Sequence, residues 1–191
     1  TKAFISVQII RQLYRKMDII NYFIKEPERE FHVRELAKLT KKSPTTISKY
    51  LKQLKKEDTL LSEKKLNHLF FKANSENPSF KDQKLFYNIK TIRDSGLINH
   101  IKYKYDPEAI ILFGSFAKAE NIERSDIDIL IITPSKKEIN LEKFEKKLKH
   151  KVQLFLHSKK DKINKKLLNT FINGIKLEGY WEFFKWSLMI S

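Results

Sequence analysis

The stretch ILFGSFAKAENIERSDIDILII, residues 111–132, decides how the C-terminal half of the chain folds. It contains most of two aliphatic runs, 109–113 and 125–133, each typical of a buried strand. Asp126 and Asp128 interrupt the second run at alternate positions, so both side chains should share one face of that strand. Burying carboxylates among isoleucines is costly unless a positive charge meets them. The stretch therefore predicts two strands and an acidic site that a cation completes.

A Gly-Ser pair, Gly114 and Ser115, ends the first run, and a short helix can begin there. Glycine lets the backbone approach a ligand closely, and backbone N–H groups with a serine hydroxyl can hold phosphate groups. Lys118, one helical turn later, could meet a triphosphate. Two neighbouring carboxylates repel each other, and Mg²⁺ bound with nucleotide phosphates is the usual way to relieve this. We therefore expect Asp126 and Asp128 to be metal ligands.

Composition limits the class of protein. The 191 residues suffice for one ordinary domain or two small ones, and 41% are hydrophobic, so folded cores are expected. The absence of cysteine excludes disulfides and thiolate metal sites. No run approaches the ~20 apolar residues of a membrane span, so we expect a cytoplasmic protein without membrane contact. The net charge of +16 favours nucleic acid or another polyanion, the alternative being a lysine-rich composition without a specific partner.

Two polar, proline-containing stretches divide the chain: NSENPS at 74–79 and KYDPEA at 104–109. They predict three regions, namely residues 1–75, a helical connector at 76–107, and residues 108–191. Apolar side chains at helical spacing also occur near the start of the chain, where an extra helix in residues 1–15 would either pack against the connector or support a homodimer.

The first region shows three helices followed by a hairpin. Apolar residues follow helical spacing near 17–24 and 33–39, and Ser43 can cap a third helix whose first residue is Pro44. Two short strands are expected near 59–63 and 68–73, with lysines in the turn between them. This order of elements is typical of a winged helix-turn-helix.

The segment FHVRELAKLTKKSPTTISKYLKQLKKE, residues 31–57, resembles the helix-turn-helix of prokaryotic winged-helix regulators. The resemblance implies that the third helix enters the major groove of double-stranded DNA and that the wing contacts the backbone. Hydroxyl side chains suit base edges, and lysines suit phosphates. A winged helix that serves protein contacts or dimerisation is the alternative. The candidate nucleic-acid-binding residues are Thr45, Thr46, Ser48, Lys49 and Lys52 in the third helix and Lys64 and Lys65 in the wing.

Gly-Ser, then ten intervening residues, then Asp-x-Asp, bracketed by strands, resembles the minimal nucleotidyltransferases of the DNA polymerase β superfamily. The resemblance covers about residues 108–180 and includes GIKLEGY at 174–180 as the closing segment. Archaeal members often carry an N-terminal winged helix. The resemblance implies an α+β chain with a small mixed-sheet domain, Mg²⁺, and ATP or another nucleoside triphosphate as substrate. By this resemblance Gly114 and Ser115 would hold the β- and γ-phosphates, and Asp126 and Asp128 would bind the metal.

The sequence departs from this family at one position. Active members place a third carboxylate on the next central strand, expected here at 151–157, and Gln153 occupies the matching position. Glutamine offers a carbonyl oxygen but neither a negative charge nor a base. One hypothesis is therefore an Mg²⁺-dependent nucleotidyltransferase that transfers adenylyl from ATP to an unknown hydroxyl acceptor. The alternative is a DNA-binding transcriptional regulator or antitoxin, paired with a cognate toxin, whose nucleotidyltransferase domain is catalytically weakened. A protein-interaction module, with an aromatic cluster at 181–186, is a third reading.

Overall fold

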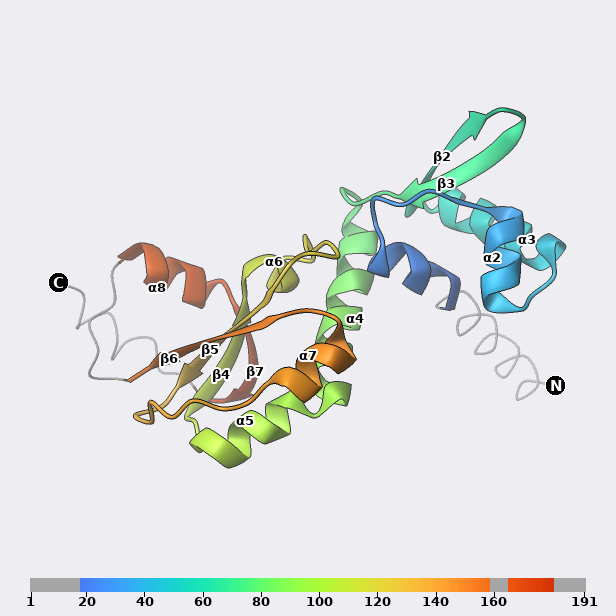
Figure 1. Ribbon diagram of the computed structural model, residues 1–191. Coiled ribbons are helices and arrows are strands. Elements are labelled where there is room, and N and C mark those ends of the chain that lie inside the picture. The colour runs from blue at the N-terminus through green and yellow to red at the C-terminus, as the bar shows by residue number, and fades with distance from the viewer. Residues whose placement is uncertain (1–17, 159–164, 181–191) are drawn as a thin grey trace, which may run out of the picture. The chain divides into compact units, whose positions relative to one another are not determined.

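The computed structural model describes residues 18–158 and 165–180, and the chain divides into two compact units between residues 83 and 84. The predicted α+β class, with an N-terminal helix-turn-helix and a C-terminal mixed sheet, is confirmed (Figure 1). The connector predicted at 76–107 contributes residues to both units. The helix expected in residues 1–15 and the aromatic cluster at 181–186 lie outside the described residues. Among the helices that the structure describes, none is long and apolar enough to cross a membrane.

The N-terminal unit consists of a helix-turn-helix and a three-stranded antiparallel sheet of order β1-β3-β2. The two-residue strand β1 was not predicted, and it pairs with the central strand of this sheet. The elements are a helical segment at 18–25, β1 (Phe31–His32), α2 (Val33–Thr40), α3 (Pro44–Lys56), β2 (Leu60–Lys65) and β3 (His68–Ala73).

Helix α3 begins where the sequence predicts. The Ser43 hydroxyl accepts a hydrogen bond from the Thr46 N–H at 3.2 Å, and Pro44 is the first helical residue. Ile47 and Leu51 lie one turn apart on the buried face of α3. The capped start and the apolar stripe together fix which face of α3 remains exposed.

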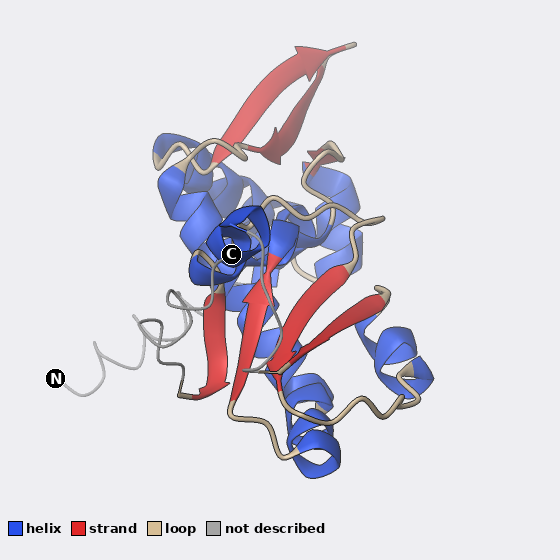
Figure 2. Ribbon diagram, turned by 90° about the vertical axis from the view of Figure 1, so that its left-hand side faces the viewer, coloured by secondary structure: helices blue, strands red, loops and turns tan. Residues whose placement is uncertain are grey.

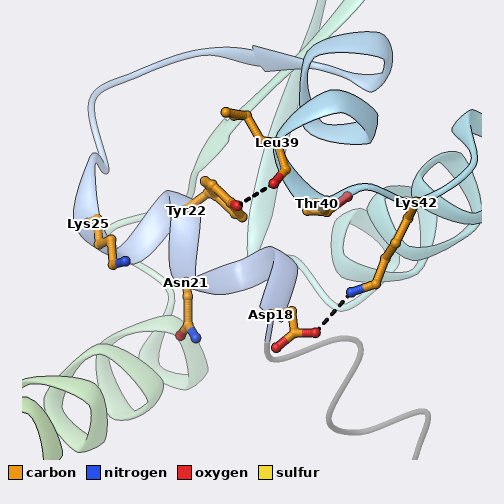
Figure 3. A pocket seen from close by; sticks show the side chains of 7 residues that line it. All are labelled: Asp18, Asn21, Tyr22, Lys25, Leu39, Thr40 and Lys42. Atoms are coloured by element: carbon orange, nitrogen blue, oxygen red, sulfur yellow. Dashed lines mark hydrogen bonds and ion pairs between the residues drawn. The ribbon is translucent and has the colours of Figure 1, made fainter.

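The helical segment at 18–25 contacts the turn between α2 and α3 and the end of α2 (Figure 3). The Tyr22 hydroxyl donates a hydrogen bond to the Leu39 carbonyl at 3.1 Å, and Lys42 Nζ lies 2.9 Å from Asp18 Oδ2. These four residues belong to the lining of a hollow of about 310 Å³. The two contacts stabilise the turn from which α3 starts.

The hairpin of β2 and β3, called the wing below, extends away from α2 and α3 (Figures 1 and 2). Its register pairs Lys65 with His68, so Leu66 and Asn67 form a two-residue turn. Both turn residues have positive φ, 45° and 63°, as a type I′ turn requires. Asparagine adopts this conformation more readily than leucine, and Leu66 is 96% exposed.

We expect the substitution Leu66→Asn to raise the free energy of unfolding by about 0.5–1 kcal/mol. Left-handed φ is costly for leucine, and removing an exposed side chain sacrifices no buried apolar surface. Urea denaturation of the full chain measures the difference, with Leu61→Asn as a control at a half-exposed position on the extended part of the wing. A lower stability of Leu66→Asn would show that the leucine side chain makes a stabilising contact in the free protein.

A four-stranded sheet of order β6-β5-β4-β7 forms the centre of the C-terminal unit. Strand β4 pairs antiparallel with β5 and β7, whereas β5 pairs in parallel with β6. Helices α5 and α7 cover one face of the sheet and α8 covers the other (Figure 1). The elements are α4 (Pro78–Ser95), which begins in the N-terminal unit, α5 (Leu97–Tyr105), β4 (Ala109–Phe113), α6 (Gly114–Ala117), β5 (Ile127–Ile132), α7 (Glu142–Leu148), β6 (Val152–His157), α8 (Lys165–Ile172) and β7 (Ile175–Gly179).

Side chains alternate along β4 and β5 between two hydrophobic clusters. Ile110 and Ile129 belong to the cluster under α5 and α7, whereas Ile111 and Leu130 pack with Phe171 of α8. Asp128 precedes Leu130 by two residues, so its carboxylate belongs to the α8 face of the sheet. The candidate site therefore lies on the face that only α8 covers among the described helices.

A buried polar network holds the loop between α6 and β5. Lys84 of α4 is 2% exposed, and its Nζ donates a hydrogen bond to the Asn121 carbonyl at 2.5 Å. Asn88, one turn later, donates to the Phe116 carbonyl at 3.0 Å and to Asn121 Oδ1 at 2.7 Å. Because buried polar groups are costly when unpaired, these bonds fix α6 and the loop relative to α4.

Candidate functional site

Asp128 and Gly114 face each other at the end of the β4–β5 pair. The register places Phe113 opposite Asp128, so the next residue of the chain lies beside the carboxylate. Gly114 has a φ of 69°, and a Cβ built on it would overlap Asp128 Oδ2 and lie 3.2 Å from Asp128 Cγ. Glycine alone accepts this φ without strain and leaves room for the carboxylate. The structure thus brings the Gly-Ser pair against the second aspartate.

Asp126 lies directly before β5, because this strand begins at Ile127 and not at Ser125 as expected. The Ser125 hydroxyl instead accepts a hydrogen bond from the Ile122 N–H at 2.9 Å and forms part of a turn. Burial, and secondly the charge of Asp126, raise the pKa of Asp128 above its ordinary value. The two carboxylates therefore repel each other in the absence of a cation.

Gln153 lies beside both aspartates. It pairs with Asp128 in the β5–β6 register, and its Nε2 donates a hydrogen bond to Asp126 Oδ2 at 2.5 Å. No three side chains of Asp, Glu, His or Cys gather into a possible metal site anywhere in residues 18–158 and 165–180. The site thus presents two carboxylates and one amide.

Glu145 holds the start of β6, the strand that carries Gln153. One of its oxygens accepts a hydrogen bond from the Val152 N–H at 3.0 Å, and the other lies 3.1 Å from Lys151 Nζ. These contacts lower the pKa of Glu145. The fixed strand start helps to define the position of Gln153 next to Asp126.

Ser115 and Lys118 lie in and directly after the one-turn helix α6, which begins at Gly114. Lys118 is exposed, and together with Gly114 it lines a pocket of about 330 Å³. The other residues that line this pocket are Ala117, Asn169, Thr170 and Asn173. The pocket therefore offers ammonium, amide and hydroxyl groups next to the Gly-Ser pair.

The sequence did not indicate the contribution of α8 to this pocket. Leu168 and Phe171 are buried against the sheet, whereas Asn169 of α8 and Asn173, directly after its last residue, are exposed. The spacing of four between these amides is a signal for one polar helix face. The sequence contains nothing to say that this face would turn toward Gly114.

The candidate DNA-binding residues of α3 lie away from its buried face. Thr45, Lys49 and Lys52 are exposed, whereas Thr46 and Ser48 are half-buried. The Thr46 hydroxyl is 2.8 Å from Ser43 Oγ, so it takes part in the helix cap. The two lysines and Thr45 are therefore the α3 residues most accessible to a ligand.

The two candidate lysines of the wing differ in their surroundings. Lys65 Nζ lies 2.6 Å from Glu30 Oε1 and 3.2 Å from Glu63 Oε2. These carboxylates raise the pKa of Lys65. Lys64 is exposed on the opposite face of the hairpin and forms no ion pair with any residue that the structure describes. The charge of Lys65 is thus already compensated by two carboxylates, whereas the charge of Lys64 is available to a phosphate group.

Two protein-family models match the chain, one in each of its two units. Residues 95–177 match the family model "Nucleotidyltransferase domain", and this range contains the Gly-Ser pair, both aspartates, Gln153 and α8. The chain contains a nucleotidyltransferase domain. Residues 15–58 match the model "Bacterial regulatory protein, arsR family", so a helix-turn-helix of the ArsR type is present as well. The match ends before β2 and leaves the wing outside it. Neither the curated proteins nor the solved structures contain a significant match to the chain.

Proposed function

We propose that the chain is an Mg²⁺-dependent nucleotidyltransferase that transfers adenylyl from ATP to a hydroxyl acceptor and binds double-stranded DNA through its winged helix. The observation that carries the proposal is the contact of Gly114 with Asp128 at the end of β4 and β5. The Gly-Ser backbone, which would hold phosphates in this proposal, lies there beside two carboxylates that repel each other. The proposal requires ATP as substrate and DNA as a binding partner, so we propose that the activity is cytoplasmic.

The residues present fit a magnesium-bound triphosphate. Mg²⁺ is usually held by one or two carboxylates together with substrate phosphates and waters, and Asp126 and Asp128 supply these carboxylates. The bound ion would neutralise charge on the phosphates and orient the α-phosphate. Gly114 and Ser115 would hold the β- and γ-phosphates, and Lys118 lines the same pocket as Gly114.

The proposed reaction is a displacement at the α-phosphorus. The acceptor hydroxyl oxygen forms a bond to this phosphorus, the bond to the α–β bridging oxygen breaks, and pyrophosphate leaves with that electron pair. The hydroxyl proton passes to water, since Gln153 is no base. Through its hydrogen bond to Asp126, Gln153 orients this carboxylate.

Doubly labelled ATP tests the proposal. With Mg²⁺ and duplex DNA, total RNA or protein as acceptor, label from the α-phosphate should enter one acceptor fraction, and label from the γ-phosphate should leave as pyrophosphate. The variant Asp126→Asn is the control. Appearance of the γ-label in free phosphate alone would indicate ATP hydrolysis and contradict nucleotidyl transfer.

A second candidate function is favoured by the amide at position 153. Without a third carboxylate, the domain would bind Mg²⁺-ATP as a ligand and serve a DNA-binding regulator or antitoxin, acting with a cognate toxin or as a homodimer. In that case the wild-type chain binds nucleotide but releases no pyrophosphate.

Pyrophosphate release by wild type separates the two candidates, and the variant Gln153→Asp tests whether the missing carboxylate limits the rate. A carboxylate at this position can act as a general base, which typically contributes about 100-fold or more to the rate. We expect pyrophosphate release to rise by about this factor if wild-type activity is measurable, and to appear for the first time if the domain is weakened. The variant Gln153→Asn, which retains an amide, is the matched control. A rate unchanged by Gln153→Asp would show that the position is not catalytic.

The wing lysines test DNA binding. We expect Lys64→Ala to reduce the slope of log affinity against log salt by about 0.9, the value for one phosphate contact. Lys65→Ala should change the slope less, because Glu30 and Glu63 already compensate its charge. Fluorescence anisotropy of a mixed-sequence duplex at several KCl concentrations measures both. Equal slopes for all three proteins would place the wing outside the DNA interface.

A further inference from the structure

Leu66, at the turn of the wing, is the most exposed large apolar side chain in the part of the chain that the structure describes, ahead of Leu61 and Leu69 on the wing strands. Lys64, Lys65 and His68 make the end of the hairpin polar, yet the side chain at its tip is leucine. Leu66 is 96% exposed and has a φ of 45°, a conformation that glycine or asparagine adopts more easily. Neither turn geometry nor burial in the free protein accounts for a leucine at this position.

The wing is long enough for its tip to enter a DNA groove. Going along the wing toward its tip, the last strand pair with a buried side chain is Ser62 with Phe71, where Phe71 is buried. Leu66 lies four residues beyond Ser62. At about 3.3 Å per strand residue, the tip extends roughly 13 Å past the core. The minor groove of B-DNA is about 7.5 Å deep, so the hairpin can pass the phosphate backbone and reach the bases.

Charge favours DNA as the occupant over an apolar protein surface. The exposed Lys64 lies two residues before the tip, and the chain carries a net charge of +16. Helix α3 of the same unit presents Lys49 and Lys52 on its exposed face. A lysine close behind the tip can contact the phosphates that flank a groove while the tip enters it.

We propose that Leu66 is a minor-groove wedge: with α3 in the major groove, the wing tip enters the adjacent minor groove and inserts the leucine side chain against a base step. Apolar side chains placed in this way unstack the step and bend the duplex. Flexible pyrimidine–purine steps would be preferred at that position, which gives specificity without a hydrogen bond to a base. The inference rests on the proposed DNA binding and adds bending and the choice of a flexible step.

The test is the bend of a duplex that carries a donor and an acceptor dye at its two ends. A 30-base-pair duplex is first enriched from a randomised pool by the wild-type protein. Energy transfer is then measured with saturating wild type, Leu66→Asn, Leu66→Met and Leu61→Asn. Asparagine suits the type I′ turn, so Leu66→Asn keeps the hairpin while it removes the wedge.

We expect wild type, Leu66→Met and Leu61→Asn to raise energy transfer equally. Leu66→Asn should bind the duplex with an affinity at most about tenfold lower than that of wild type. It should not raise energy transfer. A bend retained in Leu66→Asn, or wild-type binding without a bend, would overturn the wedge while DNA binding stands. If the wild-type protein enriches no duplex, DNA binding itself is refuted, and the wedge with it.

Discussion

Replacing Asp128 by asparagine should abolish Mg²⁺-dependent ATP binding and lower nucleotidyl transfer about a thousandfold, which corresponds to about 4 kcal/mol of transition-state stabilisation. The carboxylate contacts Gly114 and lies beside Asp126, so its charge is central to the proposed metal site. Asparagine keeps the size of the side chain and removes this charge. Transfer rates and binding titrations in the presence of Mg²⁺ measure both effects.

The same substitution should make the nucleotide-free chain more stable. Burial and the charge of Asp126 raise the pKa of Asp128, so the ionised carboxylate is disfavoured in the folded protein at neutral pH. A carboxyl with a raised folded-state pKa contributes stability at low pH, and the contribution is lost as the pH rises through that pKa. Thermal unfolding in the presence of a chelator should therefore show a higher Tm for Asp128→Asn. A variant that is both less stable and inactive would indicate a structural role instead.

Gly114→Ala should lower the free energy of unfolding by about 1–3 kcal/mol and weaken nucleotide binding. The new Cβ would overlap the Asp128 carboxylate, and alanine is strained at a φ of 69°. Gly96→Ala is the matched control, because its φ of 86° imposes a similar strain while its Cβ would meet only Phe144 Cε1, at 3.9 Å. This control should lose stability but bind nucleotide as wild type does.

A double variant isolates the contact between Gly114 and Asp128. In an Asp128→Ala background the carboxylate is absent, so Gly114→Ala should cost only the φ strain that Gly96→Ala shows. The two substitutions should thus be less than additive in the free energy of unfolding. Full additivity would mean that the glycine and the aspartate do not touch.

Local chemistry explains which parts of the fold the sequence predicts. Ser43 and Pro44 define the start of α3 because a cap and a first-turn proline act within one helical turn. Strand β1 was missed because two residues give no periodicity, and its partners Phe70 and Phe71 lie about forty positions later in the chain. Such a strand exists only through tertiary pairing.

The candidate site also has features that the sequence predicts and features that it does not. The spacing of Asp126 and Asp128 and the Gly-Ser pair were visible because strand alternation and glycine chemistry are local. The pocket that Gly114 and Lys118 share with Asn169 was not visible in the sequence. It depends on the turn at Gly174, where a Cβ would crowd the Ile111 side chain and the Leu112 carbonyl. This close approach brings α8 onto β4, and no local pattern in the sequence reports it.

The measurement that tests the central claim most directly is calorimetric titration of ATP into the full chain, with and without Mg²⁺, for wild type and Asp126→Asn. If Gly114, Ser115 and the two aspartates form one site for a magnesium-bound triphosphate, wild type should bind ATP only with Mg²⁺, and Asp126→Asn should not bind it under either condition. Binding that persists without Mg²⁺ or in Asp126→Asn, or no binding to wild type with any divalent cation, would contradict this account.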